Sequence, residues 1–343
     1  MKWLSRAFKG GARGSRSVDE LLRSALLAVL DRDLDRAEDL LGRALRLESK
    51  DVEPYMALAR LFRLRGEVGR AIRIHQNLLL RTDLEGKQRI DVLLGLGADF
   101  RQGGFLRRAI ATYEEIVAEE PRNAEALGAL EKLLAEAHEY PRAIEMAQRR
   151  ARRERVDGAG EQAALYVQMA EAQLAEGKSS EARRSVKQAL RKDRRSVEAW
   201  RVLGELEAER GRDKAALAAW ARVPALNRMS GPLVYRKLET AHAALGHARD
   251  FEAFLRRLLE EEPADADGRL ALARTLAGRG EIQEAVSELR RILARSPEDL
   301  EVREALGRIL LSEGREVEAL TEYGALLDAL ESMGLLAARE KLE

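Results

Sequence analysis

The sequence predicts an all-α protein that winds as a right-handed superhelical solenoid of repeated helix pairs. Two observations lead to this fold class. Alanine, leucine, arginine and glutamate dominate the 343 residues, whereas aromatic residues make up 4% and prolines number only 7, and this composition favours helices. The second observation is an internal repeat of about 34 residues. Helix pairs repeated at such a period stack on one another and bury their apolar faces between neighbours.

The repeat emerges when one small residue in the second half of each unit is aligned. The aligned positions are Ala37, Ala71, Ala109, Ala143, Ala182, Ala216, Phe251, Ala285 and Ala319, at spacings of 34, 38, 34, 39, 34, 35, 34 and 34 residues. A period of 34 residues is that of the tetratricopeptide repeat (TPR), in which each unit is an antiparallel pair of helices, A and B. We therefore predict about nine TPR repeats.

Each predicted pair has a turn residue five positions before the aligned residue. These residues are Gly66, Gly104, Gly177, Gly211, Gly246, Gly280 and Gly314, with Arg32 and His138 as exceptions. Glycine ends helix A there because it adopts a left-handed backbone conformation without steric cost. Small residues also recur on helix A, so we expect Ala59 to lie against Ala71 where the two helices cross.

The chain is expected to have three parts: a basic N-terminal tail (1–17), the TPR solenoid (18–330) and a C-terminal capping segment (331–343). The spacings of 38 and 39 residues predict longer loops at "RTDLEGKQR" (81–89) and "RERVDGAGE" (153–161). In the tail, Trp3 and Phe8 lie among Lys2, Arg6 and Lys9. We keep two interpretations of that tail, a weak contact with an anionic membrane surface and a solvated basic segment.

Residues with catalytic or metal-binding chemistry are sparse in the sequence. Cysteine is absent, the four histidines are scattered, and the net charge is only +1. We therefore expect no enzyme activity, no cofactor, no bound metal and no nucleic-acid partner. His75 takes the place of an aromatic residue that packs inside a repeat. The sequence lacks both a secretory signal and an apolar run long enough to span a membrane, which predicts a cytoplasmic location.

A protein partner is expected on the concave face that the A helices form. The candidate partner-binding residues are Met56, Arg60, Arg63, Arg101, Lys132 and Arg201. Arginine grips carboxylates through two parallel hydrogen bonds, and a leucine or alanine would serve the fold equally well at position 63. The competing interpretation is a solvated, charged face. The basic run "QRRARRER" (148–155) is interpreted as a solvated outer face or, alternatively, as a membrane or RNA contact.

The stretch "LFRLRGEVGRAIRIHQ" (61–76) resembles the second repeat of the lipopolysaccharide assembly protein B family. The resemblance extends over roughly residues 18–330. It implies a bacterial TPR adaptor, with an N-terminal membrane helix and a C-terminal rubredoxin-like metal tail. Such adaptors restrain lipopolysaccharide synthesis by delivering the lipid A deacetylase to a membrane AAA+ protease, at the inner face of the inner membrane.

Two features of that family are missing from this sequence. The metal tail needs four cysteines, of which the sequence has none, and a basic segment stands in place of the membrane helix. A generic TPR scaffold for another assembly or secretion complex therefore remains the alternative interpretation.

Overall fold

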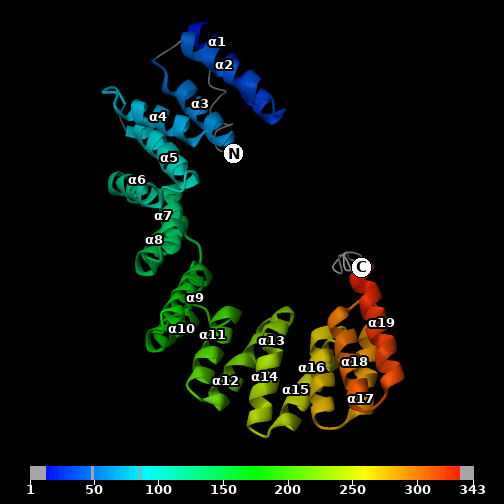
Figure 1. Ribbon diagram of the computed structural model, residues 1–343. Helices are drawn as coiled ribbons and strands as arrows, with labels where there is room; N and C mark the ends of the chain where they lie inside the picture. Colours follow the sequence, from blue (N-terminus) through cyan, green and yellow to red (C-terminus); the bar gives the residue numbers. More distant parts are fainter. Residues whose placement is uncertain (1–12, 48–49, 85, 333–343) are drawn as a thin grey trace. The chain divides into compact units, whose positions relative to one another are not determined.

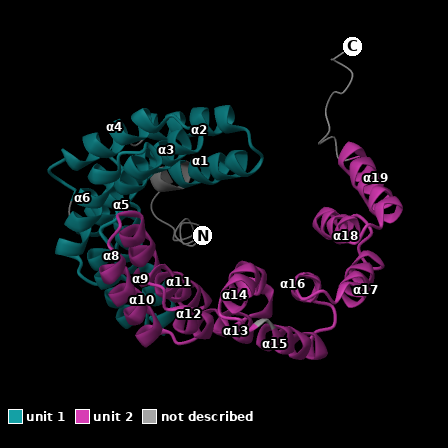
Figure 2. Cartoon of the chain, turned by 60° about the horizontal axis from the view of Figure 1, so that its bottom comes forward, with its two compact units in different colours: residues 1–165 teal, residues 166–343 magenta. Residues whose placement is uncertain are grey.

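The structure, a computed structural model, describes residues 13–47, 50–84 and 86–332, and the regular secondary structure of these residues is helical. No strand occurs among these residues (Figure 1). The all-α prediction is therefore confirmed. The chain divides into two compact units, residues 1–165 and 166–343, which Figure 2 shows in teal and magenta.

The described part of unit 1 is a series of helix pairs followed by the start of α9. The A helices are α1 (Arg13–Leu30), α3 (Val52–Leu64), α5 (Gly86–Gln102) and α7 (Ala124–Glu136), and the B helices are α2 (Leu34–Leu47), α4 (Val68–Leu79), α6 (Leu106–Glu119) and α8 (Tyr140–Glu154). From α1 to α8 each helix packs on the next along the chain, and α3 also packs on α5. Ala57 and Leu61 of α3 join the core that α1 and α2 form, so each pair buries apolar side chains on the next.

Unit 2 continues the helix pairs and contains one interruption. Its helices are α9 (Ala159–Ala175, which begins in unit 1), α10 (Ser179–Lys192), α11 (Val197–Glu209), α12 (Asp213–Trp220), α13 (Arg222–Leu226), the 3₁₀ helix η1 (Arg228–Ser230), α14 (Pro232–Ala244), α15 (Ala248–Glu261), α16 (Ala266–Gly278), α17 (Ile282–Leu293), α18 (Leu300–Ser312) and α19 (Glu316–Ser332). One apolar core extends from Ala216 on α12 to Ala319 on α19. Pro224 has no N–H to donate to the carbonyl of Trp220, which explains why α12 ends and α13 starts anew.

Every predicted turn position takes the left-handed backbone conformation. The seven glycines have φ between 67° and 82°, and the two exceptions, Arg32 and His138, have φ of 60°. The left-handed turn of the repeat therefore forms even at Arg32 and His138, where the Cβ atom disfavours that conformation. This agreement confirms the alignment of the helix pairs.

Small residues of helices A and B meet where the two helices cross, as the alignment predicts. Ala59 and Ala71 are both fully buried and share a cluster with Phe62. On α11 the small residue Gly204 instead leaves room for Trp220 of α12, because a Cβ at position 204 would lie 2.2 Å from the indole Nε1.

The prediction of longer loops is wrong in part. Helix α5 already begins at Gly86 and α9 at Ala159, and each has 17 residues where α3 and α7 have 13. The additional residues therefore lengthen helix A as well as the loops, because helical hydrogen bonds satisfy the backbone of these segments.

Helix α1 begins at Arg13, inside the predicted tail of residues 1–17. Trp3, Phe8, Lys2, Arg6 and Lys9 lie outside the described residues. The count of nine repeats, the handedness of the superhelix and the three domain boundaries stay predictions.

Candidate partner-binding groove

The A helices of three successive repeats in unit 1 line a cavity of about 600 Å³. We name it the α3 cavity. Its lining residues are Asp51, Val52, Glu53, Met56, Arg60, Arg63, Lys87, Gln88, Asp91, Leu94, Gly95, Ala98 and Glu125. Three of the predicted partner-binding residues, Met56, Arg60 and Arg63, are thus brought together on one wall. Met56 is 7% exposed, so most of its side chain belongs to the core.

The α3 cavity is nearly balanced in charge. Arg60, Arg63 and Lys87 face four carboxylates, those of Asp51, Glu53, Asp91 and Glu125. Burial, followed by the positive charge of Arg63, lowers the pKa of Arg60. The arginines of this cavity are therefore surrounded by acidic groups of the protein itself, and do not present a purely cationic surface.

Arg63 is committed to a buried polar network. Its guanidinium Nη1 donates to Asp99 Oδ1 at 2.8 Å and to the Gly95 carbonyl at 3.1 Å. The Asp99 side chain is fully buried, and its other oxygen lies 2.6 Å from His75 Nδ1. The expectation that leucine or alanine would serve equally well at position 63 is therefore wrong. The buried position of His75 agrees with the predicted packing role.

Asp99 was not among the residues predicted from the sequence. The corresponding positions of neighbouring repeats are Leu61 and Leu133, both buried in helix A. A single aspartate in a mostly apolar column was the signal that could have identified it. A charge at such a position requires buried partners, which are here Arg63 and His75.

The other predicted partner-binding residues lie apart from the α3 cavity. Arg101 on α5 and Lys132 on α7 are exposed, and neither lines that cavity. Arg201 belongs to unit 2. Partner binding by these residues stays a prediction.

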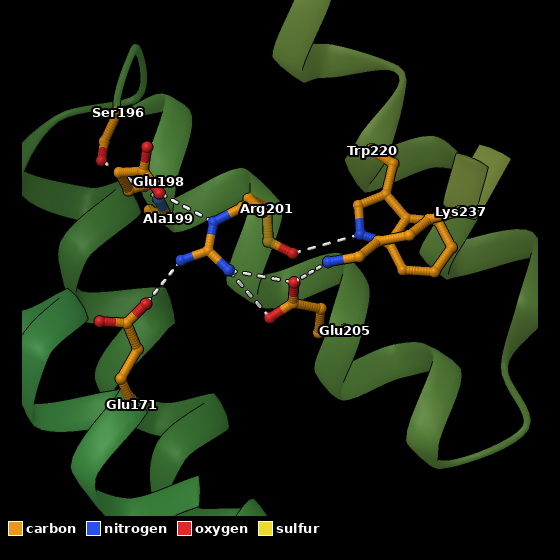
Figure 3. A network of polar contacts seen from close by, with 8 residues as sticks. All are labelled: Glu171, Ser196, Glu198, Ala199, Arg201, Glu205, Trp220 and Lys237. Carbon is orange, nitrogen blue, oxygen red and sulfur yellow. Dashed lines mark hydrogen bonds and ion pairs between the residues drawn. The ribbon is translucent and has the colours of Figure 1, made fainter. Parts of the chain in front are cut away.

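Arg201 is surrounded by acidic side chains, as Figure 3 shows. Its guanidinium donates to Glu198 at 2.8 Å, to Glu205 at 3.0 Å and to Glu171 at 2.5 Å. Burial acts to lower the pKa of Arg201, but these carboxylates outweigh it and the pKa is raised. Lys237 also bonds to Glu205. An acidic partner would have to displace one of these internal carboxylates.

A second and larger cavity of unit 1 is strongly basic. Its volume is about 1,460 Å³, and we name it the arginine cavity. It is lined by Lys87, Ile90, Asp91, Leu94, Glu120, Pro121, Arg122, Asn123, Ala124, Glu125, Arg149, Arg152, Arg153 and Arg155. Four arginines of the run 148–155 thus line a cavity, and the interpretation of that run as a solvated outer face stays a prediction.

Metal-ligand clusters and membrane-spanning helices are both absent from the described residues. No group of three or more His, Asp or Glu side chains in this part of the chain could hold a metal ion. Within the same residues, no helix is long and apolar enough to cross a membrane. The absence of metal, cofactor and catalytic activity stays a prediction.

Family models of the tetratricopeptide repeat match residues 167–226 and 244–309. The chain contains tetratricopeptide repeats. Among solved structures, this TPR protein is similar to the crystal structure of MamA protein. The match has 19% identity and a TM-score of 0.39, and it covers 52% of this chain and 97% of that one.

Curated relatives of the TPR protein carry the name that the sequence resemblance predicts. Lipopolysaccharide assembly protein B of Escherichia coli (strain K12) is 29% identical over 251 residues, which are 73% of this chain and 64% of the relative. The protein of that name from Haemophilus influenzae is 32% identical over 209 residues, 60% of this chain and 52% of the relative. The chain thus spans about 64% of the length of the first of these relatives. The resemblance is confirmed, and the TPR repeats indicate a protein-interaction scaffold.

Proposed function

We propose that the protein is a non-catalytic adaptor that holds a protein partner in the groove of unit 1. The observation that carries this proposal is the continuity of two cavities. The α3 cavity and the arginine cavity share Lys87, Asp91, Leu94 and Glu125. A groove lined by the A helices α3, α5 and α7 is the kind of surface on which stacked repeats bind an extended or helical segment of another protein.

The partner that we propose is part of the machinery controlling lipopolysaccharide synthesis. The name of the curated relatives supports this choice. The resemblance at residues 61–76 implies the same role, in which a client such as the lipid A deacetylase is presented to a membrane protease. Such presentation places the protein at the inner face of the inner membrane.

Affinity capture from the native host tests this function. The full chain should recover the lipid A deacetylase or the membrane protease after mild cross-linking. The groove variant Lys87→Glu/Leu94→Gln should lose that recovery, because both side chains lie on the wall shared by the cavities. The matched control is Arg107→Glu/Leu80→Gln, since both residues are exposed and neither lines the groove.

Two outcomes would contradict the proposal. Recovery of a different assembly or secretion complex would favour the alternative of a generic TPR scaffold. Equal recovery by the groove variant and its control would place the partner outside this groove.

A further inference from the structure

The electrostatic character of the groove changes from one end to the other. In the α3 cavity three cationic side chains meet four carboxylates. In the arginine cavity six cationic side chains meet three carboxylates, those of Asp91, Glu120 and Glu125. The cationic residues are Lys87, Arg122, Arg149, Arg152, Arg153 and Arg155. The positive charge of the groove is therefore concentrated at the end formed by α8 and the loop before α7.

The run 148–155 contains arginines with two different roles. Arg150 binds Glu131 at 3.0 Å and Glu161 at 2.6 Å, and it does not line the cavity. Arg152 and Arg153 do line it, are exposed, and form no hydrogen bond or ion pair with another described residue. The carboxylates of the described residues thus neutralise Arg150 and leave Arg152 and Arg153 unpaired.

Helix capping explains only part of this arrangement. Arg152 and Arg153 lie in the last turn of α8, where cations are favoured by the helix dipole. That effect does not account for Arg122, which comes from the loop before α7. Nor does it account for Arg149, whose guanidinium donates to the Pro121 carbonyl at 3.0 Å. Three separate segments, α5, the loop before α7 and α8, therefore contribute cations to one cavity.

We propose that the arginine cavity binds a carboxylate-rich segment of the partner protein, with the uncharged or basic part of the same segment lying in the α3 cavity. This inference rests on the proposed function and adds the direction in which the bound segment lies along the groove. Arginine side chains form strong, bidentate hydrogen bonds with carboxylates. The acidic groups of the α3 cavity would repel a segment that was acidic along its whole length.

The mixed lining favours a protein segment over other polyanions. A nucleic acid would bring phosphates next to Asp91, Glu120 and Glu125, and no aromatic side chain lines either cavity as a platform for base stacking. A lipid headgroup would leave the half-buried apolar side chain of Leu94 without a partner. A peptide can match both the charged and the apolar parts of the lining, because it can alternate charged and apolar side chains.

Peptide binding to the purified full chain tests the inference. The probes are a short peptide with a glutamate-rich half and a serine- and alanine-rich half, and its counterpart with glutamine in place of glutamate. Fluorescence anisotropy should show binding of the first peptide only. The variant Arg152→Gln/Arg153→Gln should weaken it about tenfold, the effect of two exposed ion pairs. The control Arg73→Gln/Arg107→Gln removes equal charge from exposed positions outside the groove and should bind as the unmodified chain does.

A photo-cross-linker at the acidic end of the peptide tests the direction in which the peptide lies along the groove. It should label residues 149–155 and not α3. Equal binding by the two double variants, labelling of α3, or tighter binding of single-stranded RNA or anionic vesicles would each overturn the inference. Because no host partner is used, this assay is independent of the affinity capture. Capture of an unrelated complex would refute the proposed function alone.

Discussion

The guanidinium of Arg63 lies 2.8 Å from the carboxylate of Asp99, whose side chain is fully buried. The two residues belong to α3 and α5, the A helices of successive repeats. An ionised carboxylate inside an apolar core is stable only when it is paired and hydrogen-bonded. Arg63 therefore joins neighbouring repeats from the wall of the α3 cavity.

Replacing Arg63 with leucine should destabilise the fold. The substitution leaves the buried Asp99 without its cation, a change that costs about 3 kcal/mol. Urea unfolding at neutral pH, followed by circular dichroism, measures the effect. The control is Arg101→Leu, an exposed position on α5, which should change stability by less than about 0.5 kcal/mol. Equal stability of both variants would show that the pair does not support the fold.

The fold could be predicted from the sequence because local rules set it. The left-handed turns at Gly66 and at Arg32 follow from their place in the repeat, and the Ala59–Ala71 crossing follows from side-chain size. The pairing of Arg63 with Asp99 could not be predicted, since it depends on which side chains two successive repeats bring together. The arginine cavity was missed for the same reason. Arg152 and Arg122 are 30 residues apart in the sequence and meet only through the packing of α7 and α8.

Replacing Ala71 with leucine should overpack the crossing of α3 and α4. Ala71 and Ala59 are fully buried, so the added carbons have no free space, and the cost is about 1–3 kcal/mol. Leucine introduced at an exposed site of α4, Arg73→Leu, is the control. Differential scanning calorimetry should show a lower melting temperature for the first variant only. An unchanged Tm for Ala71→Leu would contradict the assigned crossing.

Two glycine-to-alanine substitutions should change the free energy of unfolding in opposite directions. At Gly204 the new Cβ would lie 2.2 Å from Trp220 Nε1, whereas at Gly42 the nearest atom would be 3.7 Å away. Gly204→Ala should therefore destabilise the protein by about 1–3 kcal/mol through overpacking. Gly42→Ala should stabilise it by about 0.5–1 kcal/mol, because alanine favours a helix interior. Urea midpoints that move in the same direction would refute the packing role of Gly204.

A fall in pH should destabilise the fold partly through Glu207. Burial alone would raise the pKa of this carboxyl, but a hydrogen bond from Arg183 and the charges of Arg183 and Arg212 outweigh it, and the pKa is lowered. A lowered folded-state pKa means that the stabilisation is present above the ordinary value of 4.5 and is lost as the pH falls through the folded value.

At neutral pH, Glu207→Gln should cost about 1.5–3 kcal/mol, the range for hydrogen bonds to charged groups. The difference between the parent and the variant should shrink as the pH falls below the ordinary value, because protonated Glu207 is as uncharged as glutamine. Urea unfolding from neutral pH down to about pH 3 measures this trend. The exposed Glu209→Gln serves as control, with an effect below about 0.5 kcal/mol. A difference for Glu207→Gln that stayed constant over this pH range would show that its charge does not stabilise the fold.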